Sequence, residues 1–234
     1  MGLSPPVILL SGGSGARFGS DEPKQFALLG GRPLLLHSLL ALRPLGGPLV
    51  VVAPTPFIER TRTLLNGPDL GADACRLVAG GATRQASTLC GLRALFGDYE
   101  VPDGTPVVLH DGARPFLQQD EIDRLLAAFR NPQVEVASLA RPIPETLVVA
   151  GAIPGPITGT VDRELYFSIQ TPQAARAGVL RSLMNEAPGD QFTDLLTWAE
   201  ASGRKGWLVP SDARNIKVTV PADLQLAERW LESR

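Results

Sequence analysis

The stretch VILLSGGSGARFGSDEPKQ, residues 7–25, decides the fold, because it reads as a short apolar strand that runs directly into a glycine-rich loop. The loop carries four glycines: Gly12, Gly13, Gly15 and Gly19. Glycine has no Cβ, so the backbone N–H groups of such a loop can approach a phosphate closely. Arg17 and Lys24 flank the loop and supply the positive charge that phosphoryl or nucleotidyl transfer requires. The segment therefore predicts an enzyme that uses a nucleotide.

Two better-known glycine loops are excluded. A Walker-type loop ends in Gly-Lys-Ser or Gly-Lys-Thr, and neither tripeptide occurs in the chain. A dinucleotide fingerprint needs a third glycine where this chain has Phe18. What remains is Gly-Gly-x-Gly-x-Arg followed by Pro-Lys-Gln, which resembles the signature of nucleotidyltransferases that act on sugar and polyol phosphates. The alternative is a glycine-rich turn whose cations are simply solvated.

Composition indicates a single globular domain over residues 1–234. Hydrophobic residues make up 44% of the chain and charged residues 20%, which is ordinary for a protein with a sizeable core. The net charge is −2, and no block of five or more basic residues occurs. We therefore expect no nucleic acid and no membrane surface as partner, and any anionic ligand must be held by a few placed cations.

The cysteines and the N-terminus predict a cytoplasmic protein. Cys75 and Cys90 are the only cysteines, and neither has a Cys or His at metal-ligand spacing. The first residues lack the cationic start of a signal peptide. No apolar run approaches the roughly 20 residues of a membrane helix.

Strand-length and helix-period segments alternate through the first 140 residues. The expected strands are Val7–Leu10, Leu49–Ala53, Arg76–Ala79, Pro106–His110 and Val134–Leu139. The expected helices between them are Leu34–Leu42, Phe57–Leu65, Arg84–Phe96 and Glu121–Arg130. Further helices are expected at Ala175–Glu186, Asp194–Ala201 and Ala222–Glu232, with a strand near Trp207–Val209. This alternation predicts a doubly wound, Rossmann-like α/β fold with a mostly parallel sheet. Ligands bind beyond the carboxyl ends of such strands, so the segments that follow them should converge on one site.

Residues 142–162 interrupt the alternation. They combine several prolines and glycines with short β-like pieces and show no helical period. We expect a projecting β-arm that serves as a dimerisation element, because its apolar residues need a cover and a second subunit could supply one. The alternative is a flap over the site of the same subunit.

Two further segments at strand ends carry polar groups. Gly80 and Gly81 open a turn before a helix, where backbone N–H groups and Ser87 could bind a base edge or a phosphate, although such a turn is often only a turn. Asp111, in His110-Asp111-Gly112-Ala113-Arg114-Pro115, could hold Mg²⁺ directly or through water. The alternative is that Asp111 caps the loop and pairs with Arg114. His110 has no triad partner in the sequence and is interpreted as structural.

Three polar residues in the last third of the chain lack a clear structural reason: Arg163, Thr171 and Lys217. Lys217 lies in a β-branched run, where it could point to solvent from an edge strand or into a cleft. Spacing does not distinguish the two.

Taken in order, the motifs resemble the 2-C-methyl-D-erythritol 4-phosphate cytidylyltransferase family over nearly the whole chain. They are SGGSGARFG, PKQ, GGATRQAS, HDGARP, PETL, TVDR, QTPQ, TD and NIKVT. The resemblance implies attack of the acceptor's phosphate on the α-phosphate of CTP, with Mg²⁺ as cofactor, CTP and a small polyol phosphate as partners, and a homodimer whose arms exchange.

The resemblance also implies residue roles. Arg17 and Lys24 would stabilise the transition state, and Arg163 and Lys217 would position the incoming phosphate. Contacts with CTP are implied for Ser11, Gly12, Gly13, Gly15, Gly81, Ala82 and Ser87. Contacts with the polyol phosphate are implied for Thr146 and Thr171, and Arg114 is included in the substrate-binding set. Asp111 would lie near both the substrate and the metal. Thr146 and Arg163 would act in the neighbouring subunit's site.

The chain departs from the common family pattern in ways that affect the acceptor. It has Ser-Gly-Gly where many members have Ala-Ala-Gly, which is closer to enzymes for ribitol phosphate. It also has His-Asp-Gly-Ala-Arg and Pro-Glu-Thr in place of commoner forms, and Leu195-Leu196 follow Asp194. A ribitol-5-phosphate cytidylyltransferase is therefore the nearest alternative, and a non-catalytic nucleotide-binding regulatory protein is an alternative of another class. The four cations Arg17, Lys24, Arg163 and Lys217 favour an active enzyme.

Overall fold

A seven-stranded sheet forms the centre of the protein, seen in a computed structural model that describes residues 4–12, 18, 23–70, 75–186 and 192–232. The strand order is β11-β7-β10-β6-β1-β4-β5. These strands are β1 (Val7–Leu10), β4 (Leu49–Ala53), β5 (Arg76–Ala79), β6 (Pro106–Asp111), β7 (Val136–Pro142), β10 (Phe167–Arg176) and β11 (Gly206–Pro210). Four neighbouring pairs are parallel, and only β10 runs antiparallel to its neighbours β6 and β7. The mostly parallel sheet predicted from the sequence is confirmed.

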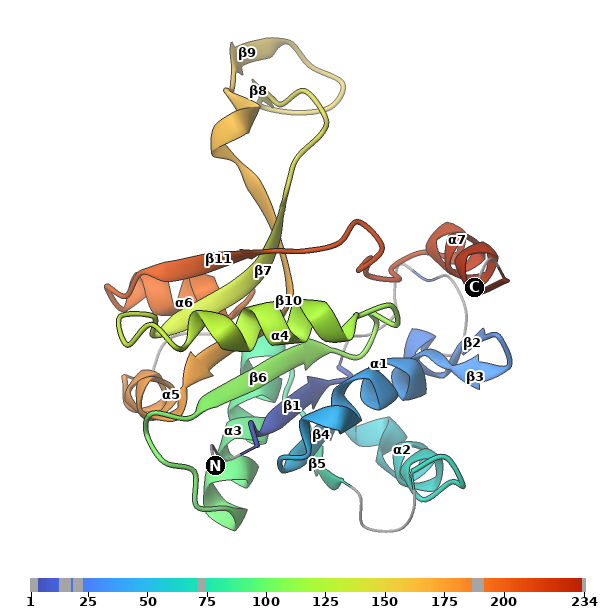
Figure 1. Cartoon of the computed structure of the whole chain (residues 1–234). Coiled ribbons are helices and arrows are strands. Elements are labelled where there is room, and N and C mark those ends of the chain that lie inside the picture. Colours follow the sequence, from blue (N-terminus) through green and yellow to red (C-terminus); the bar gives the residue numbers. More distant parts are fainter. Residues whose placement is uncertain (1–3, 13–17, 19–22, 71–74, 187–191, 233–234) are drawn as a thin grey trace.

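Helices cover both faces of the sheet, as expected for strands that are apolar on both sides. Leu9 of β1 packs on the face covered by α1 (Leu34–Leu42), α2 (Ile58–Leu65) and α4 (Gln119–Ala128). Ile8 points to the opposite face, under α3 (Arg84–Asp98), α5 (Ala177–Asn185) and α6 (Leu195–Ala201). In Figure 1, α1 and α4 lie in front of the sheet and α3 lies behind it.

A third apolar cluster attaches the C-terminal helix α7 (Pro221–Glu232) beside the small hairpin of β2 (Leu28–Leu29) and β3 (Arg32–Pro33). Trp230 of α7 meets Phe116 edge to face, with ring centroids 5.7 Å apart. This contact fixes α7 near the segment that follows β6, so α7 lies close to the carboxyl end of that strand.

The strand β10 is not predicted by the sequence analysis. Its ten residues include Pro172 and several polar side chains, and its pairing with β7 shifts register between Gln170 and Gln173. Because β10 extends through Arg176, α5 begins at Ala177 rather than at Ala175. Similarly, α4 begins at Gln119, before the expected Glu121, because Gln118 and Glu121 form a capping box there.

Within residues 142–162, β8 (Val148–Ala150) and β9 (Ile157–Thr160) form an antiparallel hairpin. The hairpin projects away from the sheet at the ends of β7 and β10 (Figure 1). Several of its apolar side chains are exposed, and Ile153 is 98% exposed. The hairpin thus exposes apolar side chains that are not buried in a hydrophobic core.

Among the described residues, no helix has the length and apolar character needed to cross a membrane.

Candidate functional site

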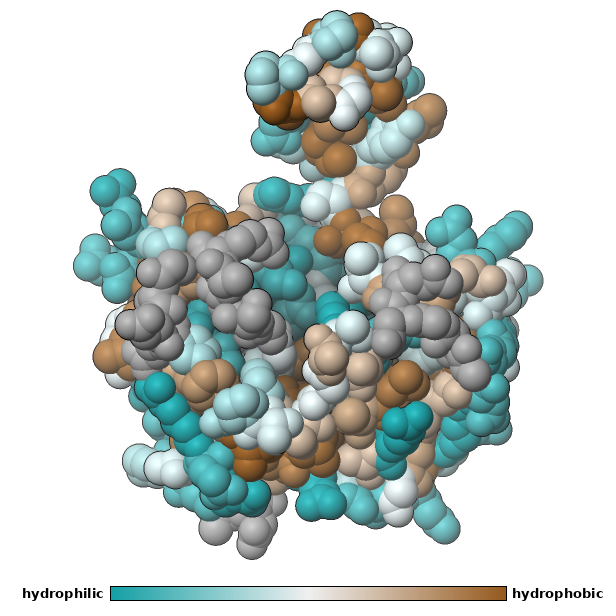
Figure 2. Space-filling view, turned by 180° about the vertical axis from the view of Figure 1, so that it is seen from behind, coloured by the Kyte–Doolittle hydropathy of each residue, from teal (hydrophilic) through white to brown (hydrophobic). Residues whose placement is uncertain are grey.

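A cavity of about 510 Å³ lies where the segments after β1, β4, β5 and β6 meet. Seen from behind, the molecule is hollowed below the base of the arm, and hydrophilic residues lie deep in the hollow (Figure 2). Eight of the predicted site residues line the cavity: Ser11, Gly12, Lys24, Gly81, Ala82, Ser87, Asp111 and Lys217. The expected convergence of the segments after β1, β5 and β6 is confirmed, because Ser11, Gly12, Gly81 and Asp111 line one cavity. Gly13, Gly15 and Arg17 lie outside the described residues.

The start of α3 forms one wall of this cavity. Thr83 caps the helix by accepting a hydrogen bond from the N–H of Ala86 (3.0 Å), and the Ser87 hydroxyl donates to the Gly81 carbonyl oxygen (3.3 Å). A Cβ on Gly81 would collide with Ala86, so the turn requires glycine here. Across the cavity, the Ser11 hydroxyl is buried and makes no hydrogen bond among the described residues. A helix N-terminus and such a hydroxyl suit an anionic or polar ligand.

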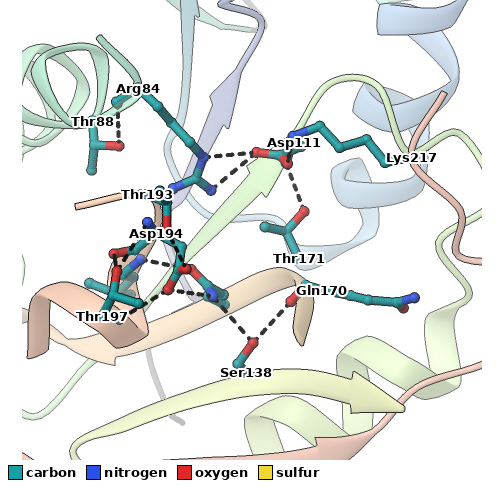
Figure 3. A network of polar contacts seen from close by, with 12 residues as sticks. Arg84, Thr88, Asp111, Ser138, Gln170, Thr171, Thr193, Asp194, Thr197 and Lys217 are labelled. Atoms are coloured by element: carbon teal, nitrogen blue, oxygen red, sulfur yellow. Dashed lines mark hydrogen bonds and ion pairs between the residues drawn. The ribbon is translucent and has the colours of Figure 1, made fainter. Parts of the chain in front are cut away.

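Asp111, at the end of β6, is the electrostatic centre of the site. Its carboxylate receives the Lys217 ammonium on Oδ2 (2.7 Å) and the Arg84 guanidinium on Oδ1 (3.1 Å), as Figure 3 shows. Burial alone would raise the pKa of this carboxyl, but Arg84, Lys217 and Arg114 together hold the pKa well below its usual range. Asp111 is therefore ionised at neutral pH, within a cluster where cations outnumber it.

Lys24 and Lys217 come from opposite ends of the chain and meet at this cavity. Lys24 lies in a short 3-10 helix (Lys24–Phe26), and its ammonium donates to the carbonyl oxygen of Val218 (3.0 Å). The sequence left open whether Lys217 points to solvent from an edge strand or into a cleft. Its side chain lines the cavity, and the residue does not belong to a strand. The residues next to it supply the backbone contact for Lys24.

Arg114 and Thr171 lie behind the cavity wall rather than on it. Arg114 is 8% exposed and donates to the carbonyl oxygen of Asn215 (2.7 Å), so it does not form the ion pair with Asp111 that was considered from the sequence. The Thr171 hydroxyl accepts a hydrogen bond from the N–H of Asp111 (3.0 Å). Both residues support the site from within the protein. His110 is fully buried beside them, in line with its structural interpretation.

Thr146 lies on the arm and Arg163 directly follows it, and neither residue lines the cavity of this chain. Both are exposed, and the Arg163 guanidinium donates to the Pro144 carbonyl oxygen at the base of the arm (2.6 Å). Their predicted roles therefore require a second subunit or a movement of the arm.

Arg84 was missed by the sequence analysis, although it lies within the quoted motif GGATRQAS. The signal was its position as first residue of a helix that follows a strand end, which directs it toward the neighbouring strand ends. It lines the cavity and holds one oxygen of Asp111. Thr219 lines the cavity as well and was not singled out.

The side chains around the cavity fit a metal ion that is coordinated mainly by the phosphates of a bound substrate. Among the described residues, no group of three or more His, Cys, Asp or Glu side chains could hold a metal. Mg²⁺ is commonly bound by one or two carboxylates together with substrate phosphates. Asp111 is an ionised carboxylate on the cavity wall and could serve as the single protein ligand.

Comparison with known proteins identifies the family. The model of the family described as 2-C-methyl-D-erythritol 4-phosphate cytidylyltransferase matches residues 6–233. The chain is 36% identical over 225 residues to the protein of that name from Leptospira interrogans, covering 95% of this chain and 90% of the relative. It is 37% identical over 229 residues to the one from Porphyromonas gingivalis, covering 97% of each.

Solved structures agree with this assignment. The structure of the enzyme of the same name from Thermus thermophilus is 29% identical and covers 97% of this chain and 98% of that chain, with a TM-score of 0.74. A synthase from Anaerococcus prevotii, 24% identical with a TM-score of 0.79, shows the same fold over 98% of this chain and 99% of its own. The ordered motifs, the strand-end cavity and these matches together show that the chain belongs to the 2-C-methyl-D-erythritol 4-phosphate cytidylyltransferase family.

Proposed function

We propose that this protein transfers CMP from CTP to the phosphate of 2-C-methyl-D-erythritol 4-phosphate, releasing pyrophosphate. The observation that carries the proposal is the placement of Lys24, Arg84 and Lys217 around one strand-end cavity in a chain that matches the family along its length. A triphosphate and a phosphate acceptor must approach each other closely, and their mutual repulsion requires such a concentration of positive charge. A regulatory protein that only binds a nucleotide would not need cations for both phosphates.

In this mechanism, an oxygen of the acceptor phosphate forms a bond to the α-phosphorus of CTP. The bond from that phosphorus to the oxygen that bridges to the β-phosphorus breaks, and pyrophosphate leaves with the electron pair. The turn at Gly81 and the start of α3 bind the nucleotide, and Lys24 stabilises charge that grows at the α-phosphate. Lys217 orients the acceptor phosphate.

We further propose that Mg²⁺ accompanies CTP and that Asp111 is its protein ligand. When bound, the ion would neutralise phosphate charge and polarise phosphoryl oxygens. Arg84 keeps Asp111 ionised and fixes its orientation, whether or not the ion binds it directly.

A homodimer completes this proposal. The exposed apolar side chains of the arm supply a surface that a second copy would cover, and the exchanged arm would bring Thr146 and Arg163 to the neighbouring cavity. Two free cysteines suit the reducing cytoplasm, which we propose as the location.

The test is a pyrophosphate-release assay with purified protein, CTP and Mg²⁺, run separately with 2-C-methyl-D-erythritol 4-phosphate and with ribitol 5-phosphate. The expected result is turnover with the first acceptor and little with the second. The opposite preference would assign the chain to the ribitol alternative suggested by Ser11-Gly12-Gly13. CTP binding without turnover on either acceptor would favour the regulatory alternative. Lys205→Ala, which changes an exposed lysine, provides the matched control for substitutions of the site lysines.

A further inference from the structure

A buried carboxylate on α4 holds the segment that delivers Lys217. This segment, residues 211–219, links β11 to α7 and is here termed the lysine loop. Glu121 belongs to the first turn of α4 and has no exposed surface. Its Oε2 accepts a hydrogen bond from the N–H of Gln118 (3.1 Å), which completes the capping box of its own helix. Its other oxygen is not used by the helix.

That second oxygen, Oε1, binds the beginning of the lysine loop. It accepts hydrogen bonds from the N–H of Asp212 (2.7 Å) and from the hydroxyl of Ser211 (2.7 Å). Removal of this oxygen would leave the partly buried N–H of Asp212 without an acceptor, and a donor left without a partner in the protein interior is destabilising. Glu121 thus fixes the loop at a point five residues before Lys217.

The middle of the loop is held by partners that lie behind the cavity. The Arg114 guanidinium donates to the Asn215 carbonyl oxygen (2.7 Å), and the Asn215 side-chain amide donates to the Thr171 carbonyl oxygen (2.9 Å). The N–H of Val218 then donates to the Ala113 carbonyl oxygen (2.9 Å). Lys217 therefore lies between two fixed residues, Asn215 and Val218, and its ammonium is 2.7 Å from Asp111 Oδ2.

We propose that Glu121 is a positioning residue for the acceptor half of the reaction, acting through the lysine loop. It does not line the cavity, so it touches no substrate. Its loss leaves the N–H of Asp212 without its acceptor, whereas Ser211 keeps its contacts with Ala140 and Gln170, and Lys217 then samples positions away from the acceptor phosphate. The proposal rests on the proposed function, because it assigns Lys217 to the acceptor phosphate.

The primary experiment is steady-state kinetics of Glu121→Ala. We expect KM for the acceptor to rise, or kcat to fall, by about tenfold or more, which is the loss typical of a buried charged hydrogen bond. KM for CTP should stay within about twofold, because the nucleotide wall is built by other segments. Glu121→Gln, whose amide oxygen can still accept from Asp212, should recover most of the activity.

The matched control is Asp120→Ala. Asp120 occupies the same helical turn, but its side chain is exposed and pairs with Arg124 on the same helix (2.6 Å). Its removal subtracts a similar negative charge from the helix start without removing a hydrogen bond to the lysine loop. Activity should therefore stay near that of the unmodified protein.

A double-mutant cycle with Lys217→Ala separates positioning from general loss of structure. If Glu121 acts through Lys217, then Glu121→Ala should cost less than about twofold once Lys217 is already alanine. Hydrogen exchange adds a readout independent of activity: the amide of Asp212 should exchange faster in Glu121→Ala and not in Asp120→Ala.

Additive effects in the cycle, or unchanged exchange at Asp212, would overturn the proposal while leaving the proposed function intact. Failure of the proposed function would be distinct, since the unmodified protein would then release no pyrophosphate with either acceptor. If Glu121→Ala does not fold, Ser211→Ala, which removes the other hydrogen bond to Oε1, replaces it in the same cycle with Lys217→Ala.

Discussion

The buried imidazole of His110 makes the stability of this protein sensitive to mild acid. His110 has no exposed surface, and its Nε2 atom lies 3.3 Å from the carbonyl oxygen of Arg114. Burial lowers the pKa of His110 to about 4, with Asp111 and the backbone hydrogen bond acting in the opposite sense. In the unfolded chain the pKa of a histidine is about 6.5. Between these values the unfolded state binds more protons, so stability present above about pH 6.5 is lost as pH falls toward 4.

The size of the effect follows from these two pKa values. Between pH 7.5 and pH 5.0, protonation of the unfolded state lowers the free energy of unfolding by about 2 kcal/mol. Asp111 does not contribute in this window, because its lowered pKa gives stability that is lost only as pH falls below the usual range for Asp, about 4.

The assay is denaturant unfolding of the protein and of His110→Gln at several pH values from 7.5 to 5.0. The variant should lose about 2 kcal/mol less over this range, whatever its stability at pH 7.5. His37→Gln measures the contribution of the only other histidine and serves as the control. Parallel curves for the protein and His110→Gln would refute the reasoning, because His110 would then bind a proton equally well in both states.

Three further predictions concern the reaction. Lys24→Ala should lower kcat on the order of 10²–10³-fold, with a smaller change in KM for CTP. The control Lys205→Ala should have little effect on either constant. A change confined to KM would mean that Lys24 binds the ground state and the transition state equally well. CTP should react far better than ATP or GTP, because the backbone at Gly81 and the hydroxyl of Ser87 offer groups that can match the amino and carbonyl edge of cytosine. Comparable turnover with a purine nucleotide would contradict the cytidylyl assignment. Mixing inactive Arg163→Ala with inactive Lys24→Ala should restore activity on subunit exchange, since some shared sites receive neither change. No recovery, with exchange confirmed by mass, would leave the arm as a flap on its own subunit.

The strands that carry the site could be predicted closely because their side chains are apolar on both faces. Val7–Leu10 and Leu49–Ala53 have the predicted bounds, and each is fully buried. Such strands show a continuous apolar run, and the segments after them necessarily meet at one edge of the sheet. That is why the turn at Gly81 and the position of Asp111 could be placed in one site from the sequence.

The antiparallel strand β10 could not be predicted, because the signals of a buried strand are absent from it. Gln170 and Gln173 are almost fully buried, but their hydrogen-bond partners come from distant segments, such as Ser211 and the start of α6. The residues that form ion pairs with Asp111 could not be predicted from the sequence either. Arg114, three residues away, was the evident partner, whereas the structure supplies Arg84 and Lys217 from 27 and 106 residues away.

The hydrogen bond from Lys24 to the Val218 carbonyl oxygen spans 194 residues and has a consequence for synthesis of the chain. While the ribosome is still making the last strand β11, every other strand of the sheet has been made, but the lysine loop has not. A chain released at that point could bury most of its core and yet would lack Lys217 and the backbone oxygen that Lys24 meets. Truncated chains would therefore be inactive toward the acceptor even where they fold, and the phosphate-transfer chemistry becomes available only once residues 211–219 have been made.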